Sequence, residues 1–402
     1  MLAPLLAALF VSVSCQPPLP ADRTRAEQLA RSGRAAEAIE LFEQIVERNP
    51  ADVEARNWIA RLELRLGRTN DAETGFRSVI RDHPGDLDAR IGLGAALTRK
   101  GAWREALDVL RNAERDAGEN SDLFGALARA YRRAGDDRRA LEYFGRAKAL
   151  APADPDLASG FESTALAYGH SIAFEGFGEH WSTDTNAASG TLALHVRAMD
   201  RLHVDASARV QQRAGASDAT AGGGMLWRAG RSDTVAVHAL GGPGNTILPT
   251  SDLSADLVHY AGAFEVGGGI RRLSFDATDV IAASPVMSWD SGGRWRLDTR
   301  YTYSRSSFAA TGETSGDHSV LLRETWRGWP RVALNLAYAY GIESFEDLTA
   351  DRLGALGATT LATGVRIGMP SLTLVFVTWE HQRRSNNTAI DRFTVSITQT
   401  FP

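Results

Sequence analysis

Four glycines lie at intervals of 34 residues in the first half of the chain. Each is followed five residues later by an alanine, and a bulky apolar residue comes four positions after that. The glycines and alanines are Gly33, Gly67, Gly101, Gly135, Ala38, Ala72, Ala106 and Ala140. A period of this length is typical of stacked helix–turn–helix units, each of which packs only against its neighbours. The period therefore predicts an array that presents a surface to a partner.

Small residues also occur inside the first helix expected in two of these units, at Gly94 and Ala128. A larger side chain where two helices cross would push their backbones apart. With this pattern, residues 22–153 resemble the tetratricopeptide repeat family in four copies. The resemblance implies an all-α, right-handed solenoid whose concave face binds a peptide or a protein segment.

The N-terminus, residues 1–15, is a short apolar segment that ends in small residues, which is the pattern of a secretory signal peptide. A buried N-terminal helix is the alternative. Cys15 is the only cysteine, so the chain cannot form an intramolecular disulfide. Its position at the end of the apolar segment is compatible with lipid attachment after cleavage; the alternative is a residue lost with, or left beside, an ordinary cleavage site.

From residue 166 onward the apolar period changes from 3.6 to two, which predicts β-strands. Residues 154–165, which lie between the helical repeats and the predicted strands, are interpreted as a linker. We expect an α + β multidomain chain with about 14 antiparallel strands in residues 166–402, twelve being possible. The expected strands are 166–181, 190–200, 203–214, 222–230, 234–242, 252–260, 263–275, 278–289, 293–307, 317–327, 330–343, 353–368, 371–384 and 390–401.

Alternation alone fits a soluble β-sandwich as well as a transmembrane β-barrel. The barrel is favoured because Arg and Asp lie on the polar strand faces, and because long links, such as 215–221 and 344–352, alternate with short ones. The short link Asp276-Ala277 is the exception to this alternation. The last strand ends in Phe401, which is interpreted as a barrel assembly signal. We therefore expect a bacterial outer-membrane protein in contact with lipid, with its repeats in the periplasm.

A Pro-bearing loop, Ile247-Leu248-Pro249, and a glycine-rich strand, 267–275, add a resemblance to the YaiO-type outer-membrane barrel family. The resemblance covers residue 166 to the end of the chain. Repeat-plus-barrel exopolysaccharide exporters have the same order of parts, with many more repeats.

The sequence does not indicate an enzyme, a cofactor or a metal site. The glycine runs lack the Lys-Ser/Thr pair of a phosphate loop, and the nine histidines lack metal-ligand spacing. His170, Ser171 and His238 lie on expected strands, but a serine hydrolase also needs an orienting acid or amide. The net charge of −5 provides no general basic surface for nucleic acid.

Arg294, Arg296, Asp298 and Arg300 alternate with apolar residues and are expected to face the barrel lumen. They would line a path for anionic or hydroxyl-rich solutes, or pair with each other across a filled interior. We therefore expect an outer-membrane barrel whose repeats recruit a protein partner in envelope transport, export or surface assembly of polysaccharide or protein. The alternative is a non-conducting barrel that anchors a periplasmic interaction scaffold. The small-molecule or polysaccharide substrate is left open.

Overall fold

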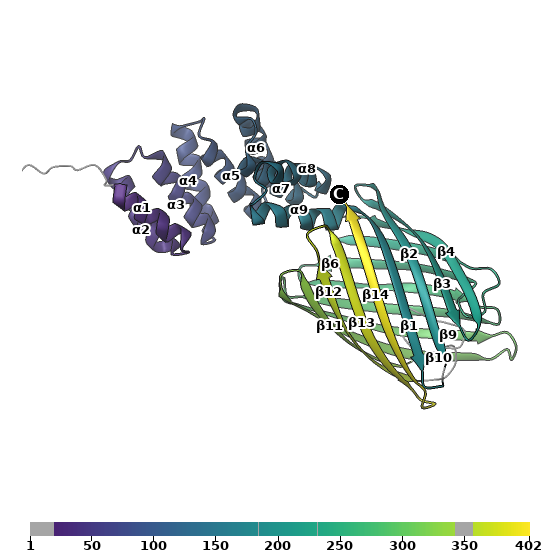
Figure 1. Ribbon diagram of the computed structural model, residues 1–402. Helices are drawn as coiled ribbons and strands as arrows, with labels where there is room; N and C mark the ends of the chain where they lie inside the picture. The colour runs from purple at the N-terminus through teal and green to yellow at the C-terminus, as the bar shows by residue number, and fades with distance from the viewer. Residues whose placement is uncertain (1–19, 184, 231, 342–356) are drawn as a thin grey trace, which may run out of the picture. The chain divides into compact units, whose positions relative to one another are not determined.

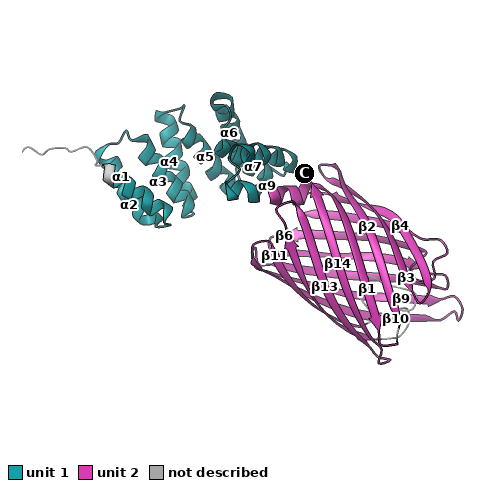
Figure 2. Cartoon of the chain, viewed as in Figure 1, with its two compact units in different colours: residues 1–161 teal, residues 162–402 magenta. Residues whose placement is uncertain are grey.

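The computed structural model describes residues 20–183, 185–230, 232–341 and 357–402 (Figure 1). It divides into two compact units, the first ending at Phe161 and the second running from Glu162 to Pro402 (Figure 2). The signal-peptide and lipidation predictions for residues 1–15, including Cys15, lie outside the described residues. Within the described ranges, no helix is long and apolar enough to cross a membrane.

The first half of the chain is helical, and its helices stack in antiparallel pairs, which confirms the predicted solenoid. The helices of the described residues are α1 (Pro20–Arg31), α2 (Ala35–Arg48), α3 (Val53–Arg65), α4 (Thr69–Asp82), α5 (Leu87–Lys100), α6 (Trp103–Ala117), α7 (Ser121–Ala134), α8 (Asp137–Leu150) and α9 (Pro155–Tyr168). The first eight form four repeats.

The four periodic glycines lie in the turns inside the repeats rather than at helix crossings. Gly33, Gly67, Gly101 and Gly135 have φ angles of 84°, 82°, 85° and 81°. This left-handed conformation is unfavourable for residues with a Cβ atom. Gly101 and Gly135 are the C-caps of α5 and α7. The 34-residue period therefore marks the point at which the chain leaves the first helix of each pair.

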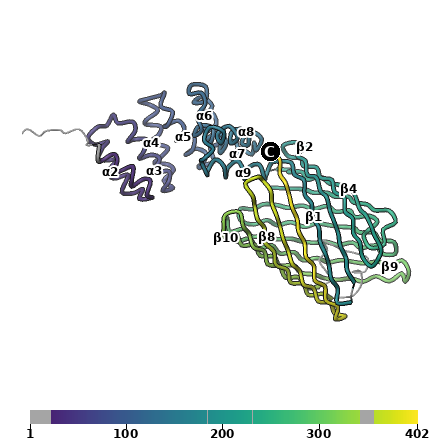
Figure 3. Tube along the Cα trace, viewed as in Figure 1, coloured from purple at the N-terminus to yellow at the C-terminus, as the bar shows by residue number. Residues whose placement is uncertain are grey.

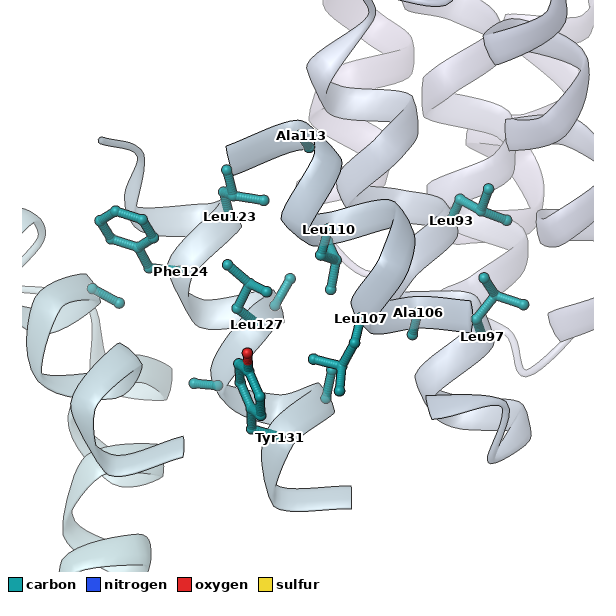
Figure 4. Close-up of a cluster of buried hydrophobic side chains, with 14 of the residues drawn as sticks. Leu93, Leu97, Ala106, Leu107, Leu110, Ala113, Leu123, Phe124, Leu127 and Tyr131 are labelled. Carbon is teal, nitrogen blue, oxygen red and sulfur yellow. The ribbon is translucent and has the colours of Figure 1, made fainter. Parts of the chain in front are cut away.

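Small residues inside the helices allow the close packing between them (Figure 4). A Cβ atom added at Gly94 would lie 2.5 Å from Cδ2 of Leu110, which is too close for the two helices to keep their spacing. Ala106 and Ala140 are completely buried. One core cluster, which includes Leu97, Leu110 and Leu127, continues through successive repeats.

Residues 154–165, interpreted from the sequence as a linker, mostly belong to α9. The side chain of Asp154 accepts hydrogen bonds from the backbone N–H groups of Asp156 and Leu157 and so caps this helix. Asp52, Asp86 and Asn120 cap α3, α5 and α7 at the same 34-residue spacing. Helix α9 therefore occupies the position of the first helix of a fifth repeat.

The second unit is a closed barrel in which every strand is antiparallel to its neighbours (Figure 3). Fourteen strands are confirmed in the described residues. They are β1 (His170–Trp181), β2 (Asn186–Met199), β3 (Leu202–Arg213), β4 (Ala216–Arg228), β5 (Asp233–Gly241), β6 (Ser251–Ala261), β7 (Phe264–Ser274), β8 (Thr278–Asp290), β9 (Trp295–Phe308), β10 (Thr314–Trp329), β11 (Val332–Gly341), β12 (Ala358–Gly368), β13 (Thr373–Arg384) and β14 (Ala389–Phe401).

Strands β1 and β14 close the barrel, with His170 opposite Phe401. The first residue of the first strand and the last residue of the last strand therefore lie at the same rim. The barrel begins at His170 rather than at residue 166, because residues 166–168 complete α9.

The predicted long link at 215–221 is wrong. Strands β3 and β4 are joined by Ala214 and Gly215 alone, with φ angles of 48° and 82°. Two positive φ angles are typical of the two-residue turn that matches the twist of a β-hairpin. The run of small residues after Gly215 resembles a loop in the sequence, but it pairs with β3. The predicted link at 344–352 lies outside the described residues.

Candidate functional site

The barrel directs apolar side chains outward and charged side chains inward. Side chains on alternate residues of each strand point to opposite faces, so the strand register assigns every residue a side. Large apolar residues on the outward side are exposed, in contrast to those of the repeats. They include Ile172, Phe174, Leu192, Leu194, Leu257, Leu322, Leu336, Leu361, Phe393 and Ile397.

Inside, an almost completely buried ion pair joins β1 and β14, the two strands that close the barrel. Glu179 and Arg392 are register partners, and the side chains are 1% and 8% exposed. The Nε atom of Arg392 donates to Oε1 of Glu179 at 2.7 Å. The guanidinium also lies over the ring of Phe177, 4.7 Å from its centroid. The ion pair and the ring of Phe177 that packs against it therefore fill this part of the barrel interior.

A second network surrounds Arg296 on β9. Its two Nη atoms donate to the two carboxylate oxygens of Glu265, each at 2.8 Å, and its Nε donates to Asp298 at 2.8 Å. Arg327 donates to Asp290 at 2.9 Å. Glu265, Asp290 and Asp298 are thus each bonded to a guanidinium group, which for Glu265 and Asp290 comes from another strand. This pairing is one of the two arrangements expected from the sequence.

The four predicted lumen residues do not occupy one place. Arg296 and Asp298 line a cavity of about 570 Å³, whereas Arg300 lines a separate cavity of about 310 Å³. Arg294 lies in the turn before β9, outside the strand, and is exposed. The predicted alternation included Arg294 in the strand, but the strand begins one residue later, at Trp295.

The 570 Å³ cavity contains more cationic than anionic side chains. Five arginines and three carboxylates line it, together with threonine and serine hydroxyls. The charged residues are Arg296, Arg323, Arg327, Arg366, Arg392, Glu175, Asp298 and Glu380. The residues on β10, β12 and β13 were not singled out from the sequence, although they share the inward alternation of β9.

The Pro-bearing loop between β5 and β6 is anchored by Asp218 on β4. One carboxylate oxygen of Asp218 accepts hydrogen bonds from the backbone N–H groups of Thr246, Ile247 and Leu248, with distances of 2.7 Å to Thr246 and 2.9 Å to Leu248. Ile247 and Leu248 are buried. The sequence showed the loop but not its anchor, because the two lie 28 or more residues apart.

The interior contains an imidazole–carboxylate pair but no complete hydrolase site in the described part of the chain. His238 on β5 lies 3.4 Å from Asp205, across Gly224, which has no side chain to separate them. Ser254 is the register partner of His238 on β6, yet no hydrogen bond joins them. Among the residues that the structure describes, no cluster of His, Cys, Asp or Glu is arranged to hold a metal ion.

The repeats carry a polar hollow of their own, lined by residues of α6 and α8. Tyr143 donates its hydroxyl to Glu114 at 3.0 Å and stacks on Tyr131, with ring centroids 5.4 Å apart. Burial, followed by the hydrogen bond to Glu114, raises the pKa of Tyr143 to about 12. Arg111 donates to the hydroxyl of Tyr131 at 2.7 Å.

Phe401, the predicted assembly residue, lies on the outward face of β14 and is exposed. Its backbone carbonyl lies against Gly169, where an added Cβ would approach the oxygen to 2.5 Å. Gly169 continues the 34-residue glycine series, and this continuation was missed in the sequence.

Comparison with known families identifies the helical half. Two models described as tetratricopeptide repeat match residues 29–90 and 123–158. The chain therefore combines tetratricopeptide repeats with a closed 14-stranded antiparallel barrel. A comparison with curated proteins gave no match.

Solved structures resemble one half or the other. A thermophilic TPR protein of Thermus thermophilus is 29% identical, with 37% of this chain and 81% of that chain covered and a TM-score of 0.35. MamA of Desulfovibrio magneticus RS-1 is 20% identical, with 37% and 83% covered and a TM-score of 0.31. The monoaromatic hydrocarbon channel CymD is 8% identical, with 62% and 93% covered and a TM-score of 0.41. The YaiO-type resemblance stays a prediction.

Proposed function

We propose that the chain is a non-enzymatic outer-membrane β-barrel protein whose periplasmic repeats recruit a protein partner, in envelope transport, export or surface assembly of polysaccharide or protein. The observation that carries the proposal is the closed barrel with an apolar outer face and a charged interior. A closed barrel satisfies all its strand hydrogen bonds and can therefore cross a bilayer.

The common rim of His170 and Phe401 supports the periplasmic assignment of the repeats. Strand ends of bacterial barrels meet on the periplasmic side when the strand number is even. Tetratricopeptide repeats are interaction modules, which supports recruitment of a protein or peptide.

Membrane insertion is tested by heat-modifiable gel migration and by recovery in outer-membrane fractions. We expect both for the wild-type chain, and recovery as a soluble periplasmic protein would contradict the proposal. Leu361→Arg, on the outward face of β12, should reduce insertion, because a cation facing lipid is unfavourable, by up to about 4 kcal/mol depending on its depth in the bilayer. Ala362→Ser, at the inward-facing neighbour of Leu361, is the matched control.

Phe401→Ala should also impair insertion if the last strand carries the assembly signal.

A second function, a non-conducting anchor for the repeats, is favoured by the buried Arg392–Glu179 pair and the Arg296 network, which fill part of the interior. Current through single molecules in a planar bilayer distinguishes the two. Reproducible open-channel current supports passage of solutes, and a silent barrel supports the anchor.

Deletion of the repeats tests recruitment. We expect a chain without residues 22–153 to insert its barrel, because the strands pair only with one another. We expect this chain not to restore the cellular phenotype that the wild-type chain supports. If the phenotype survives the deletion, the barrel alone performs the function and the recruitment proposal is wrong.

A further inference from the structure

The 570 Å³ cavity of the barrel interior has the size of a small-molecule site and a mixed lining. Phe177, Leu374 and Phe376 provide apolar surface. Hydroxyl and amide groups that can bond to a sugar-like body also line it: Thr325, Asn335, Thr378, Thr394, Ser396 and Thr398. The cavity therefore suits a ligand that has many hydroxyl groups.

Three of its five arginines are bonded to carboxylates of the barrel wall. Arg296 bonds to Glu265 and Asp298, Arg327 to Asp290, and Arg392 to Glu179. These pairs hold the guanidinium groups in fixed positions and compensate much of their charge.

Arg366 on β12 differs from these three. Its strand neighbours in register are Ala333 and Phe376, neither of which can accept a hydrogen bond through its side chain. Within residues 20–183, 185–230, 232–341 and 357–402, Arg366 has no ion pair or side-chain hydrogen bond. The charged group that acts on it is a second cation, Arg327.

Arg366 is exposed and Arg327 is half-buried, and both line this cavity, so their like charges repel each other. An anion between them would remove this repulsion. A planar guanidinium bonds a carboxylate through two parallel N–H···O hydrogen bonds, so a carboxylate is the complementary group.

We propose that Arg366, with Arg327 beside it, binds the carboxylate of a hydroxyl-rich organic anion inside the barrel, and that the hydroxyls of β13 and β14 contact the body of this ligand. The site is defined by binding alone. It therefore does not depend on whether the barrel conducts or on whether the repeats recruit a partner.

The test is calorimetric titration of the full-length protein in detergent with glucuronate, and with glucose as the uncharged counterpart. We expect glucuronate to bind and glucose to bind at least about tenfold more weakly. Arg366→Gln should weaken glucuronate binding at least about tenfold, and Arg366→Lys should restore part of it, since it keeps the charge but not the paired hydrogen bonds.

Arg383→Gln is the matched control, because Arg383 is an exposed arginine on the outward face of the neighbouring strand β13. It should bind glucuronate like the wild type. Heat-modifiable migration of each variant verifies that its barrel is folded.

Equal glucuronate affinity in the wild type and in folded Arg366→Gln would overturn the proposal, as would the absence of glucuronate binding to the wild type. Inorganic phosphate serves as a further probe. If phosphate binds through Arg366 and glucuronate does not, the assignment to a carboxylate is wrong.

Discussion

The two halves of the molecule place their apolar and charged residues in opposite ways. In the repeats, Phe42, Phe76 and Leu110 are completely buried, and most ion pairs lie at the surface. In the barrel, leucines and isoleucines are exposed on the outer face, whereas Glu179 and Arg392 are buried inside. In both halves the backbone hydrogen bonds are made within helices or between strands, so the backbone does not require particular side chains at the surface. The medium outside each half, water or lipid, therefore determines which residues its surface carries.

Ion pairs illustrate the difference. Arg90 bonds to Asp116 on the repeats at 2.6 Å, and the aspartate side chain is 63% exposed. Water competes for such a pair and screens it, so its net contribution is small. The Glu179–Arg392 pair is removed from water, so the loss of either partner would leave the other charge buried without this ion pair.

The largest expected effect follows from placing a charge in the core of the repeats. Ala106→Arg forces a guanidinium into a helix crossing and should lower the free energy of unfolding of the array by about 3–5 kcal/mol. The helical circular dichroism signal should be lost at lower temperature, while the barrel keeps its heat-modifiable migration. Ala140→Arg should behave alike. Ala117→Arg, at an exposed site on α6, is the control, and an equal loss there would contradict the packing argument.

The second prediction compares the two ion pairs directly. Glu179→Ala should reduce the free energy of unfolding of the barrel by about 3 kcal/mol, because Arg392 remains buried without its carboxylate. Asp116→Ala should cost the repeats less than about 1 kcal/mol. Denaturant titration of each variant measures the difference. Similar costs for both would show that the barrel interior is as well hydrated as the surface of the repeats.

A smaller effect concerns the helix caps of the repeats. Asn120→Ala removes the bond from the backbone N–H of Leu123 and should cost about 1 kcal/mol. Asp86→Ala should cost about 2 kcal/mol, because Asp86 also accepts a hydrogen bond from the side chain of buried Asn57. Thermal unfolding of the helical signal measures both. A larger loss for Asn120→Ala would contradict this ranking.

The smallest effect is a dependence of repeat stability on pH. The pKa of Tyr143 is about 12 in the folded state, above the value of about 10 for an exposed tyrosine. The neutral phenol is therefore favoured by folding, and its stabilisation is complete below about pH 10 and is lost as the pH rises from about 10 to about 12. Tyr143→Phe should unfold with a smaller pH dependence in this range. An unchanged slope would exclude Tyr143 as its cause.

The sequence predicted the repeats well because their contacts are local and recur at one period. The caps at Asp52, Asp86, Asn120 and Asp154 follow the same period and could have been recognised, as could Arg65 and Arg99, which donate to backbone carbonyls of the preceding repeat at Ala30 and Leu64. Extending the period to Asp154 and Gly169 would have identified α9.

The barrel interior was less predictable, because its partners are far apart in the chain. Alternation identified Arg296 and Asp298 as inward residues, but the partner Glu265 lies 31 residues away and Glu179 lies 213 residues from Arg392. Such pairs depend on the strand register and on the closure of the barrel, which a pattern of alternate residues does not determine.

Helix α9 has a consequence for self-association. A stack of helix pairs that simply stopped after α8 would expose the side of its last pair, and another copy could stack there. In this chain Leu157 of α9 is buried against the core of the repeats, and Gly160 leaves room for the ring of Phe144. The side of the last helix pair is thus already covered by α9 of the same chain, so another copy cannot stack directly on α7 and α8 without displacing this helix.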